Sequence, residues 1–136
     1  MKGDIVIVEE HHRSAARTIV DRLESDIRAA SRPYTITVAG ESGSGKSETG
    51  TAIADECANR GLEACVFQQD DYFRLPPKSN DRTRLDTLES RKKRGREPIE
   101  PFLERVLEIE HRIIAPHREK ADVIISADYE VSFVDR

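Results

Sequence analysis

Eight consecutive residues, Gly-Glu-Ser-Gly-Ser-Gly-Lys-Ser, have the types and spacing needed to bind phosphate. They fit the pattern G-x-x-x-x-G-K-[ST] at each fixed position. The glycines let the backbone curl so that successive N–H groups point at phosphate oxygens. Lys46 can reach the outer phosphates as a mobile charge, and Ser47 can place its hydroxyl on a bridging Mg²⁺. The predicted phosphate loop consists of Gly40, Glu41, Ser42, Gly43, Ser44, Gly45, Lys46 and Ser47.

The surroundings of the loop favour this interpretation over a chance turn rich in glycine and serine. A strand-like segment, Ile-Thr-Val-Ala, precedes the loop, and an alanine-rich helical pattern follows it. The positive N-terminal end of that helix would add to the attraction for phosphate. The loop alone does not distinguish a kinase from an ATPase or a GTPase. The sequence contains no N-K-x-D motif for guanine, so we expect ATP rather than GTP.

Two adjacent acids follow the next predicted strand. Asp70 and Asp71 stand in the segment Gln-Gln-Asp-Asp-Tyr-Phe. Ligands of open α/β sheets bind at the carboxyl ends of the strands. An aspartate there can accept the proton of an attacking hydroxyl or help to hold Mg²⁺. The alternative is an ordinary solvated turn at a strand end.

A basic segment, Arg-Lys-Lys-Arg-Gly-Arg, occupies residues 91–96. Residues 74–97 carry nine basic and four acidic side chains, a balance of +5, in a chain whose net charge is −4. Cations over a transferring phosphoryl group stabilise its spreading charge, and the glycine could let the segment close as a lid. The alternatives are a solvated helix end or a nucleic-acid patch. Because the rest of the chain is acidic, we do not expect nucleic acid as a partner.

These motifs need strands and helices to position them. Alternating patterns predict a single α/β domain over residues 1–136 with a largely parallel sheet and an aliphatic core. Ser14 is the expected N-cap of the first helix, and the last helix carries an apolar stripe that includes Ile109 and Ile113. Expected strands are 4–8, 34–39, 63–67 and 122–126, and expected helices are 14–30, 46–59, 85–93 and 98–116.

The cysteines and histidines suggest no metal centre. Cys57 and Cys65 form no C-x-x-C pair, so we expect reduced residues in or near the core of a cytoplasmic protein. The histidines His11, His12, His111 and His117 lack metal-ligand spacing, and we expect all of them at the surface. The chain has no signal-peptide pattern and no apolar stretch that could span a membrane.

In their order along the chain, the motifs GESGSGKS, QDDYF and RKKRGRE resemble the uridine kinase and phosphoribulokinase branch of P-loop kinases. The segment APHREKADVII is also similar to the end of uridine kinases, so the resemblance covers about residues 35–75 and 85–126. It implies a P-loop NTPase-type three-layer sandwich, reduced in size, that uses ATP and Mg²⁺. It implies Asp70 as the base, with Asp71 as its less certain neighbour at the metal and Arg91 assisting at the phosphates. The expected catalytic residues are Lys46, Asp70, Arg94 and Arg96.

The sequence departs from this family in one respect. Such kinases have an acceptor-binding region and a further apolar strand, ending in an acid, between the acids and the lid. Here only residues 74–84 lie between them, so we expect a missing internal block with its seam near residues 83–85. Two hypotheses follow. The first is a kinase that phosphorylates a hydroxyl of a nucleoside or sugar-like molecule, and the second is a minimal nucleotide-binding module. Apolar surface left by an incomplete sheet could also be covered in a homo-oligomer.

Overall fold

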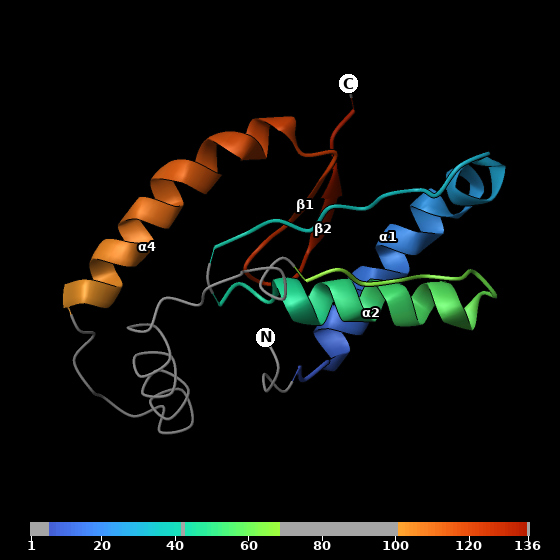
Figure 1. Ribbon diagram of the computed structural model, residues 1–136, viewed down its shortest axis with the longest axis horizontal. Coiled ribbons are helices and arrows are strands. Elements are labelled where there is room, and N and C mark those ends of the chain that lie inside the picture. The colour runs from blue at the N-terminus through green and yellow to red at the C-terminus, as the bar shows by residue number, and fades with distance from the viewer. Residues whose placement is uncertain (1–5, 42, 69–100, 136) are drawn as a thin grey trace.

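The computed structural model describes residues 6–41, 43–68 and 101–135, with the side chains of the last helix described from residue 108 onward. Figure 1 shows two crossing helices beside a small sheet, with a third helix arching away from the sheet. The elements in chain order are α1 (Glu10–Ala29), α2 (Lys46–Asn59), α4 (Pro101–Ile114), the 3₁₀ helix η2 (Ala115–Lys120), β1 (Val123–Ile125) and β2 (Val131–Phe133).

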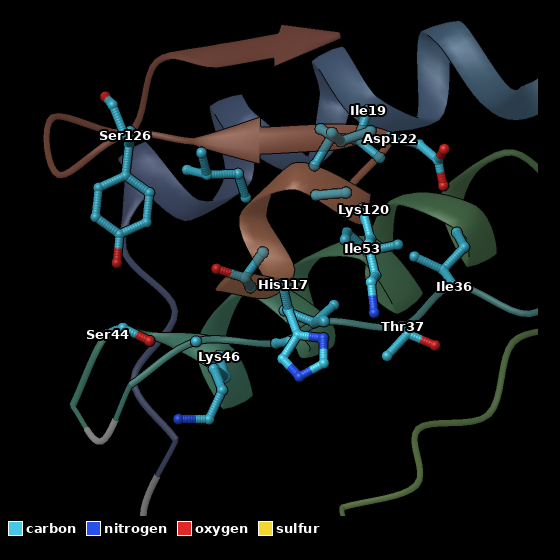
Figure 2. A pocket seen from close by; sticks show the side chains of 18 of the residues that line it. Ile19, Ile36, Thr37, Ser44, Lys46, Ile53, His117, Lys120, Asp122 and Ser126 are labelled. Carbon is cyan, nitrogen blue, oxygen red and sulfur yellow. The ribbon is translucent and has the colours of Figure 1, made fainter. Parts of the chain in front are cut away.

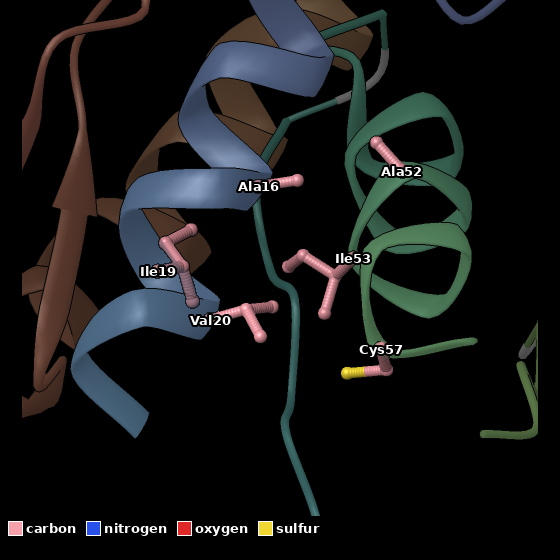
Figure 3. Close-up of a cluster of buried hydrophobic side chains, with 6 residues drawn as sticks. All are labelled: Ala16, Ile19, Val20, Ala52, Ile53 and Cys57. Carbon is pink, nitrogen blue, oxygen red and sulfur yellow. The ribbon is translucent and has the colours of Figure 1, made fainter. Parts of the chain in front are cut away.

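The core lies where α1 packs against α2 (Figure 3). Three buried residues of α1 face one side of that helix, because they are adjacent or lie three or four positions apart. They are Ala16, Ile19 and Val20. They meet Ala52, Ile53 and Cys57 of α2. The buried residues of this cluster are aliphatic apart from the cysteine, as expected for a chain without tryptophan. Ile36, Val38, Val123, Ile125 and other half-buried apolar residues pack around them.

The first helix begins earlier than the sequence predicts. Glu9, not Ser14, is its N-cap, and Glu9 forms a reciprocal capping box with His12. The Glu9 backbone N–H donates to Nδ1 of His12 over 3.0 Å, and the Glu9 side chain accepts from the His12 backbone N–H. His12 is only 5% exposed, so the prediction that all four histidines lie at the surface is wrong for this one. Its two ring nitrogens bond to the Glu9 N–H and the Tyr129 hydroxyl, which hold the ring inside the fold.

Helix α2 has the predicted bounds, Lys46–Asn59. It ends in a Schellman arrangement, in which Gly61 adopts a left-handed φ of 71°. The Leu62 N–H donates to the Cys57 carbonyl over 2.9 Å, and the Gly61 N–H donates to the Ala58 carbonyl over 3.0 Å. Beside this end, the guanidinium of Arg60 lies 2.7 Å from Asp21, 3.0 Å from Glu24 and 2.7 Å from Glu56. The arginine therefore ties α2 to α1.

The strand predictions are only partly correct. The expected strand at 122–126 is β1, which pairs with β2 in an antiparallel register, Val123 opposite Phe133. Residues 34–39 and 62–68 run as irregular backbone with no strand pairing among the described residues, so the strands predicted at 34–39 and 63–67 are wrong there. In Figure 2 the segment through Ile36 and Thr37 runs in the same direction as β1, across a cavity. Backbones must approach to about 4.8 Å to form a ladder. Among the described residues only β1 and β2 pair in this way, so the largely parallel sheet stays a prediction.

The remaining elements show where apolar side chains are left uncovered. Phe67 is 74% exposed, and Cys65 is exposed while Cys57 is buried, so the core position expected for Cys65 is wrong. Both cysteines are free thiols. In α4, Ile109 and Ile113 are exposed. The helix predicted at 85–93 lies outside the described residues, and none of the described helices is long and apolar enough to cross a bilayer.

Candidate phosphate-binding site

The phosphate loop connects the segment 34–39 to α2, and its glycines fulfil a geometric need. Gly43 and Gly45 have φ values of 79° and 82°, in the left-handed region that favours glycine. Gly45 is also the N-cap of α2. A Cβ at Gly45 would lie 2.3 Å from the Tyr129 hydroxyl oxygen, and one at Gly40 would lie 2.5 Å from Oγ of Ser44. The loop therefore brings its backbone closer to its surroundings than a side chain would permit.

Lys46 folds back onto this loop. Its Nζ donates to the backbone carbonyl of Glu41 over 2.7 Å, and the same carbonyl accepts from the Ser44 N–H over 3.1 Å. Ser47 follows in the first turn of α2, where it is half-buried. The first N–H groups of a helix have no partner within the helix and carry partial positive charge. The lysine and this helix end are thus both at the loop, an arrangement that suits a phosphate group.

A cavity of about 860 Å³ opens from the loop (Figure 2). This volume lies within the range usual for small-ligand sites, about 300–1,000 Å³. One end is lined by the loop and the opposite wall by η2 and β1. His117 and Lys120 of η2 line it together with Lys46 and one acidic residue, Asp122, so the two lysines outnumber the acid in the lining. Such clustering favours an anionic ligand.

Helix α4 touches the loop through one polar contact. Nδ1 of His111 lies 2.5 Å from Oε1 of Glu41. His111 is exposed, as the sequence predicts, and Glu41 is half-buried. The helix that follows the basic segment in the chain is thereby joined to the phosphate loop.

The structure describes only part of the predicted site. It describes Gly40, Glu41, Gly43, Ser44, Gly45, Lys46 and Ser47. The expected base and the expected lid cations lie outside the described residues, so their roles remain predictions. The predicted site residues outside the described ranges are Ser42, Asp70, Asp71, Arg91, Arg94 and Arg96.

Four residues near the loop were missed by sequence reasoning. His117 and Lys120 stand in the APHREKADVII segment, whose resemblance to uridine kinases was the available signal. His12 and Tyr129 carried no signal, because they are 117 positions apart and meet only in the fold.

Glu9, His11 and His12 also come together, contrary to the expectation from their spacing. One potential ligand atom from each lies within 4.8 Å of the others. Both ring nitrogens of His12 are already hydrogen-bonded, to the Glu9 backbone N–H and to the Tyr129 hydroxyl. A metal would have to displace one of these bonds, so the cluster is accounted for by capping.

The loop, its lysine and the helix behind it define the class of protein as a P-loop nucleotide-binding protein. The sequence profile of the Zeta toxin family matches residues 17–108, which is more than half of the chain. The chain therefore belongs to the Zeta toxin family, a P-loop kinase-like family with the P-loop NTPase fold. Membership implies phosphotransferase activity of the kinase type and use of a nucleotide. No curated protein and no solved structure matches the chain.

Proposed function

We propose that this protein is an ATP-dependent phosphotransferase resembling uridine kinase, which moves the γ-phosphoryl group of Mg·ATP to a hydroxyl of a nucleoside or sugar-like small molecule. The observation that carries the proposal is the phosphate loop, with Gly43 and Gly45 in left-handed conformations and Lys46 folded over the Glu41 carbonyl. Membership of a kinase-like family supports the reaction class. The order of the acidic and basic motifs after the loop supports a hydroxyl acceptor.

Each residue of the proposed site has a distinct task. Backbone N–H groups of the loop and the charge of Lys46 bind the phosphates. Ser47, Asp70 and Asp71 would hold Mg²⁺, which offsets phosphate charge when bound. Asp70 accepts the acceptor's hydroxyl proton as the new O–P bond forms, and the bond from the γ-phosphorus to ADP breaks. Arg94 and Arg96, assisted by Arg91, contact the phosphates from the lid.

The cavity supports an anionic ligand that is larger than phosphate. In Figure 2 His117 lies beside Lys46 near the loop, and Lys120 lies farther along the same space, so basic side chains line the cavity at more than one point. Thr35 and Thr37 of the facing segment also line the cavity and carry hydroxyl groups. A nucleotide offers both the charge and the hydrogen-bonding groups that these side chains can meet.

A coupled assay that detects ADP tests this proposal over a panel of nucleosides and pentose phosphates. We expect turnover with one class of acceptor, and its loss of at least about a hundredfold in Asp70→Asn, because a general base contributes on that order. Thr18→Val, at an exposed position on α1, is the matched control. ATP binding without turnover for any acceptor would contradict the kinase proposal.

The alternative is a minimal nucleotide-binding domain with little transferase activity. Two observations favour it. The sequence passes from residues 74–84 directly into the basic segment without an apolar strand, and the described residues contain only one antiparallel strand pair. The same panel separates the two proposals, because this alternative predicts ATP affinity with no acceptor-dependent release of ADP.

A further inference from the structure

We propose that Tyr129 and His12 are positioning residues that hold Gly45, and with it the phosphate loop, in the conformation that binds the nucleotide. The inference rests on the proposed role of the loop. His12 comes from the first turn of α1, Tyr129 from the connection between β1 and β2, and Gly45 from the end of the loop. Three segments that are distant in sequence therefore meet at the N-terminus of α2.

The contact between these residues is close and partly buried. The Tyr129 hydroxyl lies 3.0 Å from Nε2 of His12, and the two rings meet edge to face at 4.8 Å. A Cβ at Gly45 would lie 2.3 Å from the Tyr129 oxygen and 3.3 Å from Nε2 of His12. The hydrogen-bonded pair thus lies directly against the Gly45 backbone, where even a methyl group would not fit.

The hydrogen-bond pattern fixes the form of the imidazole. Nδ1 of His12 accepts from the Glu9 backbone N–H, so the neutral ring carries its hydrogen on Nε2 and donates it to the Tyr129 oxygen. Burial, followed by the charge of His11, lowers the pKa of His12, while Glu48 and Glu9 partly oppose the shift. The pair is therefore neutral at neutral pH, in the form that the geometry needs.

Tyr129 has an unusual backbone conformation. Its φ is 61°, the one left-handed value found outside glycine among the described residues. The turn around it is held by three N–H groups, since Tyr129 donates to the Ser126 carbonyl and both Asp128 and Glu130 donate to Ser126 Oγ. A residue kept in a rare conformation by its surroundings is a pointer to function. Here the conformation delivers the hydroxyl to Gly45.

The consequence for binding follows from the place of Gly45. Its left-handed conformation starts α2 and so directs the first N–H groups of that helix and the adjacent Lys46. Without the Tyr129 hydroxyl, Nε2–H of His12 loses its acceptor and the space beside Gly45 opens. The loop would then sample other conformations and bind phosphate less tightly. The core between α1 and α2 does not include Tyr129, and it should remain intact.

The test is calorimetric titration of ATP into the full chain and its Tyr129→Phe variant. We expect the Kd to rise about tenfold, which corresponds to about 1.4 kcal/mol, within the usual range for one lost hydrogen bond. Ser132→Ala, which removes an exposed hydroxyl from β2, is the matched control and should bind as the wild type does.

The pH dependence of ATP affinity distinguishes a positioning role from a purely structural one. Protonation of His12 places a hydrogen on Nδ1 against the Glu9 N–H, so ATP affinity should weaken at acidic pH more in the wild type than in His12→Gln. The protonation of ATP, and that of Glu9, His11 and Glu48 around the ring, is common to both proteins. Identical profiles would overturn the inference.

The outcomes also separate this inference from the proposed function. A wild-type chain that does not bind ATP contradicts the proposed function itself. A wild-type chain that binds ATP, with Tyr129→Phe binding equally well, overturns only the positioning role. Circular dichroism at the titration temperature measures how much of the Tyr129→Phe variant is unfolded. If that unfolded fraction accounts for the whole loss of ATP binding, the positioning role is overturned as well.

Discussion

At the scale of single residues, the phosphate loop could be predicted and its supports could not. The pattern from Gly40 to Ser47 is local, and each fixed position meets a need that can be read without the fold. The contact of Tyr129 with His12 joins two ends of the chain and has no local signature. His12 was misjudged for the same reason, since a histidine on an N-terminal turn is usually solvated.

The burial of His12 makes stability depend on pH. Burial lowers its pKa in the folded protein, so below the ordinary histidine pKa of about 6.5 the unfolded chain binds more protons. The free energy of unfolding contributed by this residue is complete above that pH and is lost progressively as the pH falls from there toward the lower pKa of the folded state. Chemical denaturation at pH 7.5 and pH 5.5 measures the loss.

The His12→Gln variant isolates this effect. Its loss of stability between the two pH values should be smaller than that of the wild type, because the remaining titratable groups are shared. An equal loss in both proteins would show that His12 titrates alike in the folded and unfolded states, which would contradict the account.

At the scale of elements, the helix that follows the phosphate loop was predicted correctly. Helix α2 ends at Asn59, two residues before the left-handed Gly61, and its predicted bounds are confirmed. The start of α1 was missed because Glu9 and His12 form the cap together, a pairing that is uncommon in sequence. The strands expected at 34–39 and 63–67 failed because strand pairing depends on segments far away in the chain.

The packing of α1 on α2 gives a prediction at this scale. Ile53 is 6% exposed in the core cluster, so Ile53→Val should lower the free energy of unfolding by about 0.5–1.5 kcal/mol. Ile113, 61% exposed on α4, offers the same substitution as a control, and its effect should stay within about 0.5 kcal/mol. Denaturant titration measures both. Equal losses would contradict the assignment of the core to the α1–α2 interface.

At the scale of the whole molecule, the sequence predicts more sheet than the described residues form. Ile36 and Val38 pack on the same core as Val123 and Ile125, yet the segments that carry them lie across the cavity without pairing. This arrangement suits our proposal that an internal block is missing near residues 83–85. A chain shortened in this way would keep nucleotide binding, which depends on the loop and α2, while acceptor choice would depend on the region that we propose is missing.

Nucleotide binding at the loop is the central claim, and calorimetric titration of ATP in the presence of Mg²⁺ tests it most directly. Lys46→Ala removes the side chain that folds over the loop, while Arg32→Ala removes an exposed cation away from the cavity. We expect wild type and Arg32→Ala to bind alike, and Lys46→Ala to bind at least about tenfold more weakly, as for a lost charge-assisted hydrogen bond. Equal affinity of all three proteins for ATP would contradict the claim.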